Sequence, residues 1–479
     1  MAPSEAGNQE ENISVSDTIP VSRNQENWKD FFIELIENRN REDLVRYLGK
    51  LYPADLAGLL TQVGLEKGFF LYEILDQEIR GEVLHELDED VRKEYLEVIT
   101  VDEIADIVRI QESDEAVHLL QDLDSETRGK VLENIPNDER LNIAELLSYR
   151  ENTAGSIMSK EFIYVLDTDT VKKAIQSIRK YARDVEDFYT VYVLDSDGVY
   201  KGHISLKTLF LSNPRGRVKK LMENELLPIQ HHLDQEEVAK FFTRYDFITA
   251  PVVDERGIMI GRITADDVME VMEEEASEDI LRLGGVISGD ETMSTPLVSS
   301  SLKRMLWLGM NLITAFIAAG VVSYFESTIS HALILAALMP IVAGIGGNAA
   351  GQSVAVIVRN IALGEVSISN ARRAITREFL LGLLNGLFIG ILTGLAVYLV
   401  SWNIHGLSKA TALAGIIFFA MFINMIIAAL AGAGIPLIMK KLGADPAVAS
   451  GIFVTACTDI LGFFVFLGLA TLAIIFKFI

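Results

Sequence analysis

Five long apolar segments after residue 300 constrain the fold of this chain more than any other feature. They lie near residues 305–325, 332–358, 378–401, 411–438 and 449–476. A hydrocarbon core about 30 Å thick is crossed by roughly 20 apolar residues in a helix, and every segment reaches that length. The sequence therefore predicts an integral membrane protein with five transmembrane helices in its C-terminal part.

The acidic residues lie almost entirely outside these segments. The 479 residues include 67 acidic and 42 basic side chains, and residues 1–300 hold 62 of the acids and 32 of the bases, a net charge of −30. The residues after 300 have a net charge of +5. A surface so negative disfavours nucleic acid and attracts divalent cations. We expect an acidic soluble half joined to a membrane half.

The basic residues between the spans indicate the orientation, because positive loops stay in the cytosol. Most of them fall on one side of the spans, and two fall on the other. The first group is Lys303, Arg304, Arg359, Arg372, Arg373, Arg377, Lys440 and Lys441, and the second is Lys409 and Lys477. Residues 1–26 are polar, have no signal-peptide core, and are expected to be a disordered tail. The prediction is a multi-pass protein of the cell (inner) membrane, with a cytosolic N-terminus and the C-terminus outside.

One carboxylate, Asp459, lies inside the fifth apolar segment. Such a group costs on the order of 3 kcal/mol at mid-bilayer and is usually functional. No Lys or Arg lies inside the spans to pair with it, which leaves a cation, a proton or a hydrogen bond between helices. Thr455 precedes it by one turn on the same helix face. Five helices make a thin bundle, so we expect a homodimer that brings two Asp459 carboxylates together, an arrangement suited to a hydrated divalent ion.

The second segment contains a Pro and Gly cluster at residues 339–352. We expect this cluster to interrupt the helix and to free backbone carbonyls. Irregular backbone at membrane depth is tolerated only where it is buried or lines water. The sequence thus places a candidate part of the ion path here.

Residues 27–150 repeat short amphipathic helices. Residues 42–48, 80–87 and 128–135 each set aliphatic side chains at i, i+1 and i+4, which predicts one apolar stripe per helix. Stacked helices of this kind predict an all-α superhelical domain.

The only cysteine, Cys457, lies in an apolar segment, so no disulfide and no thiolate metal site forms within one chain.

Residues 151–270 alternate β-branched strands with helices, and the pattern occurs twice. The two halves resemble a tandem CBS domain, a regulatory module that often binds adenine nucleotides. The resemblance places a nucleotide site near Tyr189, Lys207 and Asp267. The ribose-binding Asp of the module corresponds to Asp267 in the second half but to Thr208 in the first, so ATP stays an open alternative.

The next residues, 266–280, predict an acidic helix that runs toward the first span. Asp267, Glu270, Glu274 and Glu278 share one face of it. Like charges at this spacing destabilise a bare helix, so bound cations would lock it. We assign residues 271–300 to a connecting segment and residues 301–479 to the membrane domain.

Three motifs in combination identify the chain as similar to the MgtE family of magnesium channels. They are the GGN-x-x-x-Q element at 346–352, the A-D-P-A turn at 444–447 and T-D-x-x-G at 458–462. The resemblance implies a multi-domain membrane protein with a helical N domain, a tandem CBS domain, an acidic plug helix and a five-helix membrane domain. It also implies a homodimer without enzymatic activity, and the chain contains no P-loop.

The resemblance also implies residue roles. Asp459 would hold hydrated magnesium in the pore, with Asn348 and Thr455 beside it. Carboxylates of the soluble half would sense cytosolic magnesium. These are Glu82, Asp102, Asp106, Asp246, Asp267, Glu270, Glu275, Glu278 and Asp279.

The function expected is channel-like transport of Mg²⁺, which is both cargo and regulator, with closure when cytosolic Mg²⁺ is high. Two alternatives stay open at the level of sequence. One is a proton- or sodium-coupled exchanger in which Asp459 titrates. The other is a receptor that senses magnesium or nucleotide without transporting. Oxygen ligands suit Mg²⁺, Mn²⁺, Co²⁺ and Ca²⁺ alike, so the sequence leaves selectivity among them open.

Overall fold

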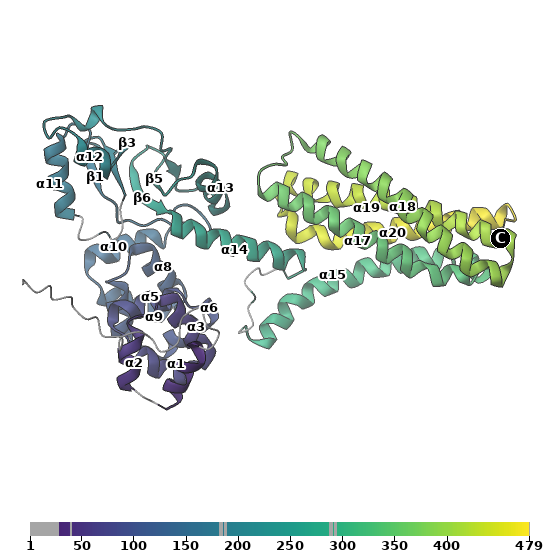
Figure 1. The fold of residues 1–479 in the computed structure, drawn as a ribbon, viewed down its shortest axis with the longest axis horizontal. Helices are drawn as coiled ribbons and strands as arrows, with labels where there is room; N and C mark the ends of the chain where they lie inside the picture. Colours follow the sequence, from purple (N-terminus) through teal and green to yellow (C-terminus); the bar gives the residue numbers. More distant parts are fainter. Residues whose placement is uncertain are drawn as a thin grey trace, which may run out of the picture. The chain divides into compact units, whose positions relative to one another are not determined.

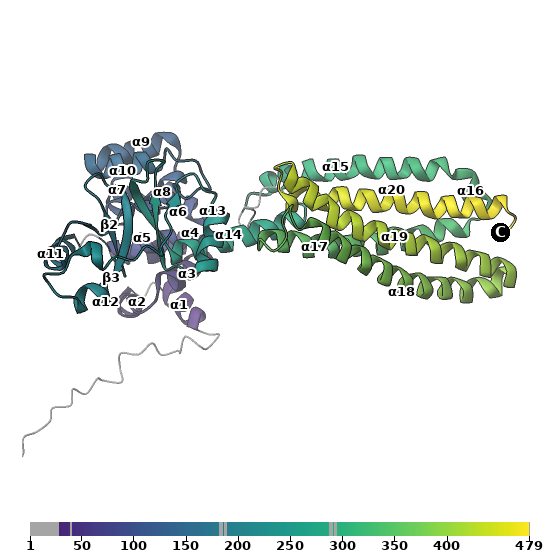
Figure 2. The ribbon, with the colours of Figure 1, turned by 90° about the horizontal axis from the view of Figure 1, so that it is seen from above.

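The computed structural model describes residues 28–38, 41–181, 185, 189–286, 291 and 295–478. The predicted disordered tail, residues 1–26, lies outside the described residues. The chain forms two compact units, Met1–Met269 and Glu270–Ile479. Figures 1 and 2 show the helices and sheets of the first unit and the long helices of the second.

Ten short helices open the first unit. They are α1 (Trp28–Glu37), α2 (Arg41–Leu48), α3 (Pro53–Val63), α4 (Leu65–Tyr72), α5 (Gln77–His85), α6 (Glu89–Val98), α7 (Val101–Val108), α8 (Ser113–Gln121), α9 (Ser125–Asn134) and α10 (Asn137–Leu146). Most of them bury several aliphatic or aromatic side chains against their neighbours, whereas α9 buries only Val131. Val83, Leu84 and Leu87 are fully or almost fully buried, whereas Val45 of the first predicted stripe is 56% exposed. The all-α prediction for this region is confirmed.

Two three-stranded sheets follow in the same unit. The elements of the first half are β1 (Tyr164–Leu166), α11 (Val171–Tyr181), β2 (Thr190–Leu194), β3 (Tyr200–Ser205) and α12 (Leu206–Leu211), and a 3₁₀ turn at Val218–Lys220 leads on. Those of the second half are β4 (Ile229–Gln230), α13 (Gln235–Tyr245), β5 (Thr249–Val253), β6 (Met259–Thr264) and α14 (Ala265–Leu283). In each half the first two strands are parallel and the last two antiparallel.

The two halves are related by an exchange of backbone hydrogen bonds. Tyr200 N–H donates to Gly257 O at 3.0 Å, and Met259 N–H donates to Gly198 O at 3.1 Å. The buried hydroxyls of Tyr192 and Thr249 also meet across the halves at 2.7 Å. This symmetry confirms the predicted tandem repeat. The helix α14 begins directly after β6, the last strand of the second sheet.

The second unit contains five helices long and apolar enough to cross a membrane among the residues described, as predicted. They are α15 (Leu297–Tyr324), α17 (Ile334–Ala362), α18 (Ala371–His405), α19 (Leu407–Lys441) and α20 (Pro446–Ile475). A short helix that the sequence did not predict, α16 (Glu326–His331), separates the first two. Only Gly406, with φ +80°, connects α18 to α19.

The expectation of an interrupted second span is wrong. The helix α17 runs unbroken through the Pro and Gly cluster, with Pro340 inside it. Proline removes one backbone donor from a helix, yet a single loss of this kind is tolerated where neighbouring helices pack closely. Of the glycines in the cluster, Gly346 packs closely against the Asn424 side chain of α19, whereas Gly344, Gly347 and Gly351 have no atom within 4 Å of an added methyl group.

Four glycines of α18 allow it to lie directly on α19. They are spaced four residues apart, so they share one helix face, and they are Gly382, Gly386, Gly390 and Gly394. A methyl group placed on Gly386 would lie 2.8 Å from Phe422 O, and one on Gly394 would lie 3.1 Å from Ala414 O. Small residues at such a seam permit the close approach on which helix association in lipid depends.

Substituting the seam should separate the two helices. We expect Gly386→Ala to destabilise the membrane unit by about 1–3 kcal/mol, because the added methyl overlaps a backbone carbonyl that cannot move aside. Thermal unfolding of the purified chain in detergent would measure the effect. Gly415→Ala on α19 is the matched control, since no atom lies within 4 Å of the methyl it adds. Equal melting temperatures for the two variants would contradict the packing role.

Candidate functional site

The carboxylate Asp459 lies on α20, on the face that also presents Gly451 and Thr455 at four-residue intervals. Thr455 is exposed and Asp459 partly exposed in the single chain. The Thr455 hydroxyl donates to Gly451 O at 2.8 Å, and the Thr458 hydroxyl donates to Thr455 O at 2.9 Å. The face therefore presents oxygen atoms along the helix, with the carboxylate at one end of the row.

Asp459 has no hydrogen-bond or ion-pair partner within the part of the chain that the structure describes. The interpretation that no basic residue of the spans neutralises it is thus supported. An isolated carboxylate in a membrane span is costly. A cation or a proton from outside the chain, or a group from a second chain, can offset that cost.

A second carboxylate in the spans, Glu378 on α18, behaves differently. Its side chain is buried, accepts a hydrogen bond from the Ser353 hydroxyl at 2.8 Å and lies 3.5 Å from the Arg377 guanidinium. It lines a cavity of about 180 Å³ together with Gln352 and Asn385. Glu378 is therefore satisfied inside one chain, and the sequence analysis did not nominate it because its hydrogen-bond donor, Ser353, comes from another helix.

The amide of Asn424 on α19 connects the helices that carry the candidate site. Asn424 is fully buried, and its Nδ2 donates to Val342 O of α17 at 2.9 Å. Methyl groups on Gly346 of α17 and Gly462 of α20 would lie 2.3 Å and 2.8 Å from its side chain. Each glycine thus makes room for one side of this amide. The amide in turn holds Gly346 of α17 and Gly462 of α20 at the same level of the bundle.

This alignment brings the motif residues to the same level of the bundle. Asn348 follows Gly346 by two residues on α17, and Asp459 precedes Gly462 by three on α20. Asn348 is exposed in the single chain, as Thr455 is. The motifs at 346–352 and 458–462 are therefore joined through Asn424, a residue that the sequence analysis missed because it lies in neither motif.

Removing this amide should loosen the site. We expect Asn424→Ala to lower the free energy of unfolding by about 1–2 kcal/mol, since a buried interhelical hydrogen bond and its contacts are lost. Asn360→Ala is the control, because the Asn360 amide bonds only to Val356 O of its own helix. Thermal unfolding of both variants in detergent tests this. A larger loss in Asn360→Ala would refute the role of Asn424.

In the first unit, the helical region and the two sheets line a cavity of about 280 Å³. Carboxylates of both regions face it, namely Glu112, Glu115 and Asp266, together with the Arg262 guanidinium. Arg262 Nη2 donates to both oxygens of Glu112, at 2.8 and 3.0 Å, and the Ser159 hydroxyl donates to Glu112 at 3.0 Å. The single positive charge is thus already paired, and the cavity stays acidic.

Next to it lie two carboxyl groups with perturbed proton affinity. Asp114 is 9% exposed, and its Oδ1 has no hydrogen-bond partner among the described residues. Burial, and then the negative charge of Asp267, raise the pKa of Asp114 well above its usual value. Burial raises the pKa of Asp267 to about 6, although Thr264 donates two hydrogen bonds to its Oδ2. The two groups repel each other when both are ionised.

The structure places four of the nominated sensing carboxylates elsewhere on the first unit. Glu82 and Asp246 are exposed. Asp102 is exposed and accepts a hydrogen bond from Asn134 at 2.8 Å, while Asp106 pairs with Arg109 at 3.4 Å. Of the nominated residues of this unit, only Asp267 belongs to the acidic pair, and its partner Asp114 was not nominated.

The other nominated carboxylates follow along α14. Glu270, Glu275, Glu278 and Asp279 are all partly exposed. Glu278 forms an ion pair with Arg282, and Arg282 also reaches Asp445, the residue that caps the N-terminus of α20. The acidic face of α14 thus includes one internal positive charge, close to its C-terminal end.

Two of the three residues predicted to bind a nucleotide lie at the acidic cavity, and the third does not. Tyr189 lines the acidic cavity, and Asp267 accepts hydrogen bonds from Thr264, whose side chain also lines it. Lys207 is exposed on α12 and is not among the lining residues. A cavity with this excess of carboxylates suits a cation better than a polyphosphate.

No closed metal cage occurs in the described part of either unit. Within the described residues, no three His, Cys, Asp or Glu side chains gather closely enough to hold a metal ion. Mg²⁺ commonly keeps several waters and uses only one or two carboxylates. The chemistry of both carboxylate sites therefore fits a hydrated hard cation.

Together, a five-span unit with an unpaired carboxylate and a soluble unit with paired sheets define the class of membrane cation transporters that have soluble domains. Three family models match the chain. They describe a divalent cation transporter at residues 339–469, the MgtE intracellular N domain at 30–152, and CBS domains at 154–212 and 218–274. The chain belongs to the MgtE family.

Curated relatives agree with this assignment. The magnesium transporter MgtE of Thermus thermophilus is 30% identical over 452 residues, which cover 92% of this chain and 97% of the relative. The magnesium transporter MgtE of Enterococcus faecalis is 36% identical over 332 residues, 69% of this chain and 71% of the relative. A solved cytosolic domain of the Mg²⁺ channel MgtE in complex with ATP is 30% identical and covers 51% of this chain and 98% of that structure, with a TM-score of 0.47.

Proposed function

We propose that this chain transports Mg²⁺ across the membrane along a path lined by the face of α20 that carries Thr455 and Asp459. The observation that carries the proposal is the contrast between the two carboxylates of the spans. Glu378 is satisfied by Ser353, whereas Asp459 has no partner in the described chain. A carboxylate left without a partner in a span is available to a passing cation.

The proposed path is completed by a second copy of the chain. Thr455 and Asn348 are exposed in the single chain although they lie within membrane helices. A twofold axis beside this face would oppose two Asp459 carboxylates and two rows of oxygen atoms. Such a ring attracts a divalent ion and lets it keep most of its water shell.

Transport itself is the first test. In proteoliposomes with low internal Mg²⁺, we expect the wild-type chain to take up Mg²⁺ and Asp459→Ala to reduce uptake at least about tenfold, because the charge that attracts the ion is lost. Glu365→Ala, in the exposed loop between α17 and α18, is the matched control and should keep wild-type uptake. Equal uptake in all three proteins would remove Asp459 from the path.

The same vesicles separate a channel from an exchanger. Uptake through a channel follows the membrane potential and does not require a proton or sodium gradient. A dependence on either gradient would favour the exchanger, and wild-type vesicles without uptake would favour a receptor.

We also propose that the acidic pair Asp114 and Asp267 contributes to sensing of cytosolic Mg²⁺. The support is electrostatic, since burial raises the pKa of both carboxyl groups and the negative charge of Asp267 raises the pKa of Asp114 further. A divalent cation between the N domain and the second CBS half offsets this repulsion. Binding that favours one arrangement of the domains shifts the equilibrium toward it, and the arrangement favoured at high Mg²⁺ is proposed to be the closed one.

The pH dependence follows from the sign of these shifts. A carboxyl whose pKa is higher in the folded state binds more protons there, so stability increases as pH falls from 7 toward 4. We expect a fragment of residues 1–285 in chelator to gain on the order of 1–2 kcal/mol between pH 7 and pH 5. Added Mg²⁺ should stabilise it at pH 7 and have little effect at pH 5.

Substitutions distinguish the buried pair from the carboxylates nominated on the family resemblance. Asp114→Asn should stabilise the fragment in chelator and abolish most of the Mg²⁺ effect at pH 7. The exposed pair Asp102→Asn and Asp106→Asn is the control. Loss of the Mg²⁺ effect in the control alone would transfer the sensing role to those two residues.

A further inference from the structure

A wide groove on the surface of the membrane unit has no role in the transport path proposed above. It has a volume of about 680 Å³ and lies along the first turns of α18. Its lining is polar at one end and apolar at the other. The lining residues are Ser369, Asn370, Arg372, Arg373, Thr376, Arg377, Leu380, Leu381 and Leu384.

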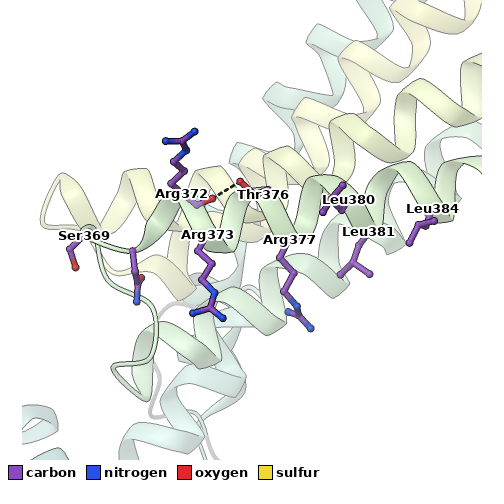
Figure 3. Close-up of a pocket in the computed structure, with 9 residues that line it drawn as sticks. Ser369, Arg372, Arg373, Thr376, Arg377, Leu380, Leu381 and Leu384 are labelled. Carbon is purple, nitrogen blue, oxygen red and sulfur yellow. Dashed lines mark hydrogen bonds between the residues drawn. The ribbon is translucent and has the colours of Figure 1, made fainter.

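Arginine and leucine side chains follow one another along one face of the helix. Arg373, Arg377 and Leu381 are spaced four residues apart, and Figure 3 shows them on the same side of α18. Eight residues of helix span about 12 Å. The groove therefore presents arginine side chains at the end of the span, with Arg373 and Arg377 in line with Leu381, and continues as an apolar surface toward the interior of the span.

The charge at the polar end is only partly neutralised. Arg377 lies 3.5 Å from one oxygen of the buried Glu378, and its own side chain is 68% exposed. Arg373 is exposed, and the described residues give it no ion-pair partner. The N-terminus of α18, which begins at Ala371, adds the partial positive charge of its free amides.

We propose that this groove binds one anionic phospholipid, with its phosphate on Arg373 and Arg377 and an acyl chain along Leu381 and Leu384. Arginine holds phosphate through paired N–H donors in a fixed geometry. Basic pockets on membrane helices at the level of the headgroups bind acidic lipids in this way. The leucines are exposed, Leu384 to 66%, and they need an apolar neighbour in the bilayer.

Charge complementarity favours a lipid over a second copy of the membrane unit. After residue 300 the chain has only five acids. Among them, Glu378 is buried against Ser353, and Asp445 is paired with Arg282. A free phosphate would use the arginines but would leave the apolar half of the groove empty.

The test is lipid binding to the full-length chain in detergent, measured by native mass spectrometry. The probes are phosphatidylglycerol and phosphatidylcholine with the same acyl chains. We expect wild-type protein to prefer phosphatidylglycerol by on the order of tenfold. The double variant Arg373→Gln with Arg377→Gln should lose this preference while its binding of phosphatidylcholine stays unchanged. Leu384→Asn should weaken binding of both lipids.

Arg359→Gln is the matched control, because it removes the same charge from an exposed arginine near the C-terminal end of α17 that is not among the residues lining the groove. It should keep the preference within about twofold. Equal losses in the control and the double variant would overturn the site in favour of diffuse attraction. If the double variant does not fold, Arg373→Gln alone must still reduce the preference, since Arg373 has no internal partner.

Two further outcomes would also overturn the proposal. Displacement of phosphatidylglycerol by millimolar glycerol phosphate would assign the arginines to a free phosphate. If the wild-type protein showed no preference for phosphatidylglycerol over phosphatidylcholine, the groove would instead be assigned to contact with another part of the protein or with a second copy.

Discussion

The membrane unit is organised by the need to satisfy polar groups where no water competes. Inside lipid, each carboxylate or amide must find its partner in the protein or in what the protein carries. Glu378 accepts a hydrogen bond from Ser353, and Asn424 donates one to Val342 O. Asp459 has no hydrogen-bond or ion-pair partner in the described chain. The difference between satisfied and unsatisfied groups therefore separates the packed scaffold from the surface along which we propose that the ion passes.

The scaffold depends on small residues as much as on hydrogen bonds. Glycines of α18 bring that helix onto the carbonyls of α19, and Gly346 and Gly462 accept the two sides of Asn424. Lipid is as apolar as leucine, so helices in it associate through close packing and a few polar contacts. This requirement accounts for the glycines of the α18 seam and for Gly346 and Gly462.

Much of the fold could be predicted from the sequence, because its signals are local. The lengths of apolar segments gave the five spans, and the repeated strand pattern gave the paired sheets. Contacts between distant segments were harder. Asn424, Glu378 and Asp114 have ordinary neighbours in sequence, and their importance comes from Val342, Ser353 and Asp267, which lie 82, 25 and 153 positions away. Pro340 led to a wrong prediction, because its local propensity indicates a break in the helix, whereas α17 continues through it.

The single-residue connection at Gly406 has a consequence for experiments on topology and insertion. Because α18 ends at His405 and α19 begins at Leu407, this end of the hairpin offers almost no chain to a protease, an antibody or an inserted reporter tag. The two helices are also too tightly joined to enter the bilayer independently, so they should be inserted as one hairpin. Labels for accessibility mapping belong instead in the loop at residues 363–370, where the chain has room to accept them.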